Sequence, residues 1–356
     1  RVPTGARLKG DTLKLEVYIN RYKVQFAKRL HNTLEIIMEE KVSIVIPAYN
    51  AATFIERTVE KIKKQSYANW ELLIVNDGSK DNTGTVIDNI ANADERIVAL
   101  HQENGGEISA RRTGAIHASG KWVTFVDADD MLPETAIASL MKYHQTGADV
   151  IVGTMHVQNF KPTGEKFEDY VYQNRKTGII NGTEFACGVL TSHIQMSACG
   201  KLYKKSILDS FPWCLDRQIK QNPDLLMNVG IGAYINQVYV TNEPVYEYLI
   251  HEGSASSGVM PFVNWMRLFD AADKYIKNYT QPEKLYEAFF HYRMERFDCM
   301  LRHGIINFPP NDTHVVHIIQ ECTNYTLTND EKKVKALLQS MLLRKVFNWW
   351  QKRKNK

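Results

Sequence analysis

The sequence predicts an α/β fold, a mostly parallel sheet with helices on both faces, followed by a C-terminal helical region. Two observations lead to this prediction. Short apolar runs alternate with segments of helical periodicity from residue 41 to about residue 160, which is typical of repeated strand–helix–strand units. The runs are apolar at consecutive positions, as expected for strands that are buried on both faces.

Five strands are expected between residues 41 and 160. Each is a short, mostly apolar run, and four of the five end in a polar or glycine-rich stretch. In chain order the runs cover residues 42–46, 70–75, 96–100, 121–126 and 149–154.

Helices are expected in the intervals between these strands. Thr53-Phe54-Ile55-Glu56 has the spacing of a capping box and predicts a helix that reaches about Gln65. The other three begin near Asn82, cover residues 107–118 and run from Pro133 to about Gln145.

The chain divides further by its composition. Residues 1–40 predict an N-terminal helical extension with one basic helix over 15–38, and because the first residue is Arg1 we expect a fragment of a longer sequence. Residues 41–160 form the sheet-rich half described above. A turn at Lys161-Pro162-Thr163-Gly164 leads into a second half, residues 161–258, and residues 259–356 form the C-terminal helical region.

Charge, cysteine count and hydropathy exclude several classes of protein. The net charge is only +4, from 44 basic and 40 acidic residues, so no nucleic-acid partner is expected. Five cysteines without CxxC spacing indicate neither a disulfide framework nor a zinc site and favour a reducing, cytoplasmic setting. No run of about 18 apolar residues suggests a membrane span, and the N-terminus lacks a signal-peptide pattern.

Polar residues gather directly after four of the predicted strands. Because the carboxyl ends of parallel strands meet at one edge of a sheet, where ligands bind, we expect these residues to form one site. They are residues 47–50, 76–78, 104–106 and 127–130.

The fourth strand end is the richest in charge. Asp127 and Asp129 are spaced so that both can face one ligand, and hard cations such as Mg²⁺ or Mn²⁺ use one or two carboxylates together with phosphate oxygens. Asp130 is expected to cap the helix that starts near Pro133.

The first and second strand ends predict contacts with a nucleobase. Tyr49 can stack on a base and Asn50 can hydrogen-bond it, while Asp77 can accept a hydrogen bond from a ring nitrogen. The alternative for Asp77-Gly78-Ser79 is a simple turn and helix cap. The sequence has neither a GxGxxG motif after the first strand nor a P-loop motif, which disfavours dinucleotide and P-loop sites.

Five short motifs occur in the order and spacing of the family 2 glycosyltransferases. The chain resembles that family over about residues 41–258, and the resemblance implies an A-type glycosyltransferase fold with a nucleotide-sugar-binding half (41–160) and an acceptor-binding half (161–258). The motifs are Val45-Ile46-Pro47-Ala48-Tyr49-Asn50, residues 75–83, Asn104-Gly105-Gly106, Ala110-Arg111 and Phe125-Val126-Asp127-Ala128-Asp129-Asp130.

The resemblance implies roles for individual residues of the donor site. It places the nucleoside on Pro47, Tyr49 and Asp77, with Asp77 on the uracil ring. Asp127 matches the acid near the ribose and the metal, and Asp129 the acid that binds the metal itself. The remaining donor-binding residues are Gly105, in the glycine turn, and Arg111, which matches a family arginine after that turn.

Downstream motifs match the family less closely. Asn222-Pro223-Asp224 falls where the family has Glu-Asp, which makes Asp224 the implied catalytic base, and Asp216 is the competing candidate. His251 begins a segment that resembles the family's loop over the donor diphosphate; the alternative is a surface histidine.

The resemblance implies an inverting, metal-dependent transfer of a sugar from a nucleotide-sugar donor, UDP-linked, to a hydroxyl of a glycan or lipid-linked acceptor in surface polysaccharide synthesis. A nucleotidyltransferase would need a glycine-rich basic loop after the first strand, and Pro47-Ala48-Tyr49-Asn50 is not such a loop. A catalytically inactive, glycosyltransferase-like scaffold is the alternative from another class, and the departures from the family pattern at Asn76, Arg112 and Pro223 favour it.

The C-terminal tail, residues 332–356, places apolar residues and two tryptophans at helical spacing among lysines and arginines. That combination predicts either peripheral contact with an anionic membrane, at the inner face of the cytoplasmic membrane, or a helix packed on its own domain.

Overall fold

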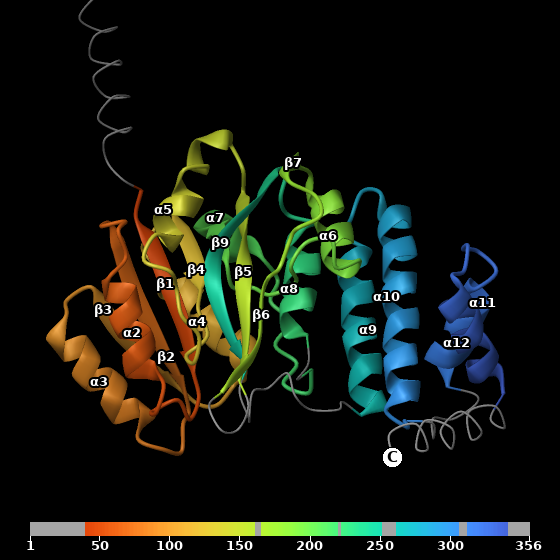
Figure 1. Cartoon of the computed structure of the whole chain (residues 1–356), viewed down its shortest axis with the longest axis horizontal. Coiled ribbons are helices and arrows are strands. Elements are labelled where there is room, and N and C mark those ends of the chain that lie inside the picture. Colours follow the sequence, from red (N-terminus) through yellow and green to blue (C-terminus); the bar gives the residue numbers. More distant parts are fainter. Residues whose placement is uncertain (1–39, 161–164, 220–221, 251–260, 306–311, 341–356) are drawn as a thin grey trace, which may run out of the picture. The chain divides into compact units, whose positions relative to one another are not determined.

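The computed structural model describes residues 40–160, 165–219, 222–250, 261–305 and 312–340. Within these ranges the chain forms a nine-stranded mixed sheet flanked by helices (Figure 1). The strand order is β3-β2-β1-β4-β8-β5-β9-β7, and β6 pairs with β5.

The first four strands are parallel, as the sequence predicts. β1 (Val42–Ala48) lies between β2 (Trp70–Asp77) and β4 (Trp122–Phe125), and β3 (Ile97–Gln102) pairs with β2. The three consecutive residues Ile44, Val45 and Ile46 are fully buried, so both faces of β1 are covered. The α/β fold class is confirmed.

The connections in this half create a reversal of direction next to β1. Helices α2 (Ile55–Lys63) and α3 (Thr83–Ala93) carry the chain outward from β1 to β3, and α4 (Glu107–His117) carries it back to β4 on the other side of β1. Because such connections are right-handed, α4 lies on the opposite face from α2 and α3. The point of reversal is where open α/β sheets bind ligands.

The second half of the sheet is mixed. β8 (Lys201–Lys204) lies antiparallel between β4 and β5 (Val150–Phe160), while β9 (Val238–Ile250) runs parallel to β5. The edge strands β6 (Lys166–Val171) and β7 (Gly178–Ile180) are antiparallel to their neighbours. The uninterrupted parallel arrangement therefore ends at β4.

Two expected helix boundaries are wrong. The capping box at Thr53 is absent, because α2 begins at Ile55 and Phe54, its N-cap, makes no side-chain cap bond. The turn is closed by the backbone instead, since Ala51 O accepts from the amides of Phe54 and Ile55. The helix predicted from Pro133 is shorter, α5 (Ala136–Met141), and a 3₁₀ turn follows at His144–Thr146.

The C-terminal region is helical, as predicted. Its described helices are α9 (Phe262–Ile276), α10 (Pro282–Arg302), α11 (Thr313–Glu321) and α12 (Asn329–Gln339). The preceding half, residues 161–258, contributes α6 (Gly182–Leu190), α7 (Lys205–Ser210) and α8 (Pro223–Ile231). α8 packs against α6 and α9, and α10 packs against α6, α9 and α12.

Residues 1–41 and 42–356 are separate units. The helix expected over 15–38 lies outside the described residues, and so does most of the basic tail. In the part of the tail that is described, Val334 and Leu338 are buried. No described helix is long and apolar enough to cross a membrane.

Candidate functional site

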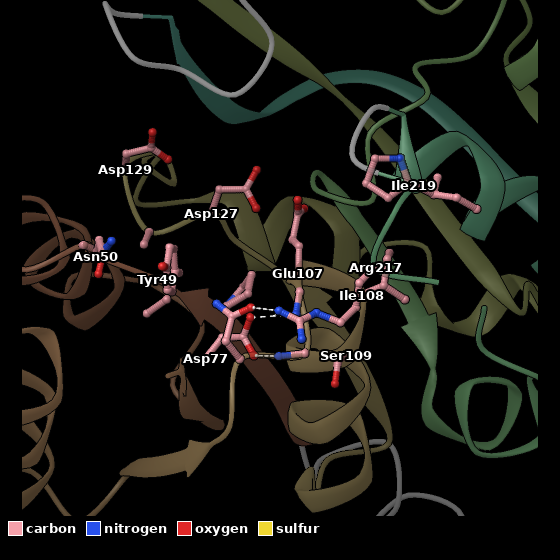
Figure 2. A pocket seen from close by; sticks show the side chains of 18 of the residues that line it. Tyr49, Asn50, Asp77, Glu107, Ile108, Ser109, Asp127, Asp129, Arg217 and Ile219 are labelled. Carbon is pink, nitrogen blue, oxygen red and sulfur yellow. Dashed lines mark hydrogen bonds between the residues drawn. The ribbon is translucent and has the colours of Figure 1, made fainter. Parts of the chain in front are cut away.

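A pocket of about 670 Å³ opens at the carboxyl ends of β1, β2 and β4, where the connections reverse direction. Segment 214–219, between α7 and α8, forms its far wall, and Figure 2 shows the side chains that face it. Seven of the predicted donor- and metal-binding residues line it: Pro47, Tyr49, Asn50, Asp77, Gly105, Asp127 and Asp129. His251 lies outside the described residues.

The loop after β1 is held by the loop after β2. The amides of residues 50, 51 and 52 donate to the side chains of Ser79, Thr83 and Asp81 at 3.0, 2.8 and 3.3 Å. Asn50 has a φ of 50° and accepts a hydrogen bond from the Lys80 amide at 2.8 Å. These bonds leave the Tyr49 ring half exposed at the pocket rim.

Asp77 organises the glycine turn that follows β3. Its carboxylate accepts hydrogen bonds from the amides of Gly105 (2.7 Å) and Gly106 (2.8 Å) and from Gln102 Nε2 (2.7 Å). Gly106 has a φ of 88°, a left-handed conformation that favours glycine. Asp77 therefore does more than close a local turn or cap a helix, because it links the end of β2 to the end of β3.

Asp127 and Asp129 point into the pocket from the turn after β4 (Figure 2). Asp130 does not cap a helix, contrary to expectation. It is buried and accepts hydrogen bonds from the Leu249 amide at 2.9 Å and from the Tyr246 hydroxyl at 2.7 Å. Its partners lie on β9, well over 100 residues away in the chain.

Arg111 is fully buried and does not line the pocket, although the resemblance implied that it would. Its guanidinium contacts three carboxylates. Nη2 lies 2.5 Å from Glu107 Oε1 and 2.9 Å from Asp127 Oδ1, and Nη1 pairs with Asp224. One buried cation thus joins the turn after β4, the first turn of α4 and the first turn of α8.

The charges around Arg111 shift one another's pKa values. Partial removal from water raises the pKa of Glu107 to about 8; Asp224, Asp127 and Asp129 add to the rise and Arg111 opposes it. Burial also raises the pKa of Asp127, against the opposing effect of Arg111. Burial alone would lower the pKa of Arg111, but the three carboxylates raise it well above its usual value.

Asp224 is more enclosed than a residue of the pocket wall. It does not line the pocket, and its Oδ2 accepts hydrogen bonds from the Ala198 amide at 2.8 Å and from Ser197 Oγ at 3.3 Å. The loop that supplies these donors is fixed by Lys201, which is fully buried and donates to the carbonyls of Gln195 and Ser197. Burial lowers the pKa of this lysine to about 7. Asp216, in contrast, does line the pocket.

Sequence reasoning missed two charged residues of the pocket. Glu107 could have been found, because its spacing of four from Arg111 on one helix is that of an ion pair. Arg217 carries no comparable signal. It reaches across from segment 214–219 and donates to Asn104 Oδ1 at 2.7 Å (Figure 2). Among the described lining residues it is the only cation, beside five acids: Asp77, Glu107, Asp127, Asp129 and Asp216.

The model of "Glycosyl transferase family 2" matches residues 43–210. "Glycosyltransferase GlyA" of Streptococcus pneumoniae serotype 4 is 30% identical over 229 residues, 62% of this chain and 32% of that protein. "Uncharacterized glycosyltransferase EpsJ" of Bacillus subtilis is 38% identical over 207 residues, 58% of this chain and 60% of that protein. The chain thus spans less than two thirds of the length of these curated relatives.

Solved structures of S. aureus TarS resemble the chain over most of its length. TarS 1–349 in complex with UDP-GlcNAc superposes with a TM-score of 0.62 and 17% identity, covering 87% of this chain and 89% of that one. The complex with UDP gives 0.59 and 16%, covering 89% and 92%. At this level of identity the likeness shows a shared fold.

Proposed function

Because residues 43–210 form a domain of glycosyl transferase family 2 in an A-type glycosyltransferase fold, we propose that this chain transfers a sugar from a nucleotide-sugar donor to a hydroxyl of a glycan or lipid-linked acceptor, with inversion, in polysaccharide synthesis. The observation that supports this most directly is the acidic pocket at the reversal point of the sheet. Carboxylates and an exposed aromatic ring from three strand ends meet there.

The proposed donor is UDP-linked. Pro47, Tyr49, Asn50, Asp77 and Gly105 line one end of the pocket and would hold the nucleoside. The TarS complexes with UDP and UDP-GlcNAc, which share the fold, support this choice of nucleotide. Arg111 acts on the donor only indirectly in this proposal, through the carboxylates that it holds.

Asp127 and Asp129 are the proposed ligands of a divalent cation, Mn²⁺ or Mg²⁺. The donor set fits, because the carboxylates of the pocket outnumber its one guanidinium and would repel a diphosphate unless a cation balanced them. No group of three or more acidic, histidine or cysteine side chains among the described residues is placed to hold a metal alone. A hard cation that takes one or two carboxylates and completes its shell with phosphate and water needs no third such ligand. When bound, it would supply Lewis-acid stabilisation of the leaving diphosphate.

Asp224 is the proposed general base, which would take the proton from the acceptor hydroxyl. It follows Pro223, a lining residue, in the first turn of α8. For this role its pairing with Arg111 must loosen when substrates bind. Asp216 is the second candidate, favoured by its place in the pocket wall. Transfer by Asp224→Asn and Asp216→Asn variants separates the two.

We also propose that the protein works in the cytoplasm. All five cysteines are free thiols, as a reducing setting would keep them.

A panel of UDP-, GDP- and dTDP-sugars with Mn²⁺ tests the proposal. The wild-type protein should release nucleoside diphosphate from one donor, and Asp129→Ala should release none. Glu60→Gln, at an exposed position on α2, is a control that should match the wild type. If no donor is consumed and UDP with Mn²⁺ gives no thermal shift, the chain is instead a scaffold that retains the fold.

A further inference from the structure

The turn after β4 is held by a tyrosine and an acid that do not reach the pocket. Tyr246 and Asp130 are each 1% exposed and neither lines the pocket. The Asp127 amide donates to the Tyr246 hydroxyl at 3.0 Å, and that hydroxyl donates to Asp130 Oδ2 at 2.7 Å. The phenol oxygen therefore accepts and donates at once, as a hydroxyl can.

The same turn is fixed by β9 and α2. Asp130 Oδ1 accepts from the Leu249 amide, and the backbones of Met131 and Glu247 exchange two hydrogen bonds at 3.2 and 2.9 Å. From the other side, the buried Thr58 hydroxyl lies 2.8 Å from Ala128 O and 3.0 Å from Asp130 O.

These contacts all engage backbone groups or Asp130. They fix the path of residues 127–130 without using the side chains of Asp127 and Asp129, which face the pocket. Carboxylates that share a site repel each other, so their separation must be imposed by the surrounding structure. Groups behind metal-binding carboxylates typically orient them and tune their affinity.

We propose that Tyr246 and Asp130 are positioning residues for the cation and donor site: through the Asp127 amide they set the geometry in which Asp127 and Asp129 bind a divalent cation. The inference rests on the proposed function, since it takes those two acids as the cation ligands. The competing account is that the network only adds stability to the sheet.

Calorimetric titration of the full chain with Mn²⁺ alone separates the two accounts. Tyr246→Phe keeps the ring and removes the hydroxyl, so the Asp127 amide and Asp130 Oδ2 lose their shared partner. We expect the Mn²⁺ dissociation constant to rise by about 10- to 100-fold, the range typical of lost outer contacts at metal sites. If donor turnover is found, the Mn²⁺ concentration for half-maximal activity should rise similarly.

Tyr279→Phe is the matched control. Tyr279 is also buried and its hydroxyl donates to the carbonyl of Val229, but it lies in the helical region and does not line the pocket. Both variants lose a buried hydroxyl bond and should lose thermal stability. Only Tyr246→Phe should weaken Mn²⁺ binding.

A wild-type Mn²⁺ dissociation constant in Tyr246→Phe would overturn the inference, as would a wild-type protein that binds no Mn²⁺. If Tyr246→Phe does not fold, Asp130→Asn replaces it. The oxygen of the asparagine amide can still accept from the Leu249 amide, but its nitrogen cannot accept from the Tyr246 hydroxyl. This variant should also weaken Mn²⁺ binding. Failure of the proposed function looks different. The wild type would then bind Mn²⁺ with loss in Tyr246→Phe, yet bind no nucleotide.

Discussion

Arg111 is the residue on which the charge balance beneath the pocket depends. It is fully buried between Glu107, Asp127 and Asp224, and no other described cation makes a direct ion pair with these three acids. Replacing it with methionine leaves three partly enclosed acids without the buried cation that they share. We expect Arg111→Met to lower the free energy of unfolding by about 3–5 kcal/mol, measured by urea denaturation.

Arg293→Met is a useful comparison for that measurement. Arg293 is also buried and pairs with Glu321 through two contacts of 2.8 and 2.6 Å, but it lies on α10. Arg293→Met should lower the free energy of unfolding and leave UDP binding unchanged. Arg111→Met should lower the free energy of unfolding and also weaken UDP binding. A loss below about 1 kcal/mol in Arg111→Met, the size of an exposed pair, would contradict the charge balance described here.

Glu107 makes the stability of the metal-free protein depend on pH. Its pKa in the folded state is about 8, against an ordinary value of 4.5. Between those values the folded protein holds a proton that the unfolded chain releases, so stability is highest at low pH and falls as pH rises. Lys201 has a pKa of about 7 in the folded protein. Well below that pH it is protonated in both the folded and the unfolded protein, so it does not change how stability depends on pH there.

We therefore expect the melting temperature of the wild type to fall between about pH 5 and 7 relative to Glu107→Gln, in which the amide cannot lose a proton. Scanning calorimetry without metal measures both slopes. Equal slopes in the two proteins would show that Glu107 is ionised throughout this range.

Which residues meet in the pocket was predictable, but how several are held was not. Asp77, Asp127 and Asp129 follow buried strands, and the edge of a parallel sheet brings strand ends together. Asp130 was misassigned because a cap is a local interaction, whereas its partner Tyr246 is 116 residues away. Arg111 was wrongly assigned to the pocket wall. It is buried because α4 packs against β1 and β2, and a short sequence motif does not reveal that packing.

Among the secondary structure elements, the parallel half was predicted well and the rest less so. Consecutive apolar residues identify β1, β2 and β4 because both faces of each are covered. β3 is an edge strand and only partly buried, but its apolar run was also recognised. β8 was not predicted as a strand. It has only four residues, Lys201–Lys204, and two of them are lysines. It becomes a strand by pairing with both β4 and β5, an interaction that neither length nor periodicity indicates.

The C-terminal tail has two parts, of which only the first, residues 332–340, lies within the described structure. Val334 and Leu338 of α12 are buried, and α12 packs on α10 and α11, so residues 332–340 belong to the helical region. Within the tail, contact with a membrane would then come from residues 341–356, which lie outside the described part and contain Trp349, Trp350 and six basic residues.

Deletion of residues 341–356 should therefore reduce binding to anionic liposomes without lowering the melting temperature, because the buried positions of α12 remain. Sedimentation with vesicles that contain phosphatidylserine measures the binding, and vesicles of neutral lipid are the control. Equal sedimentation of the full chain and the truncated chain would argue against a membrane role for the tail.

At the scale of the whole molecule, the position of β8 affects how the protein unfolds. It lies in the half assigned to the acceptor, yet it hydrogen-bonds both β4 and β5, which belong to the half assigned to the nucleotide. Cutting the chain near residue 160 would therefore remove β8 from between β4 and β5 and expose strand edges that pair readily with other chains. The two halves are expected to unfold in one cooperative transition, and an isolated N-terminal half to aggregate. In this sheet, a division of labour between the two halves would not make them independent folding units.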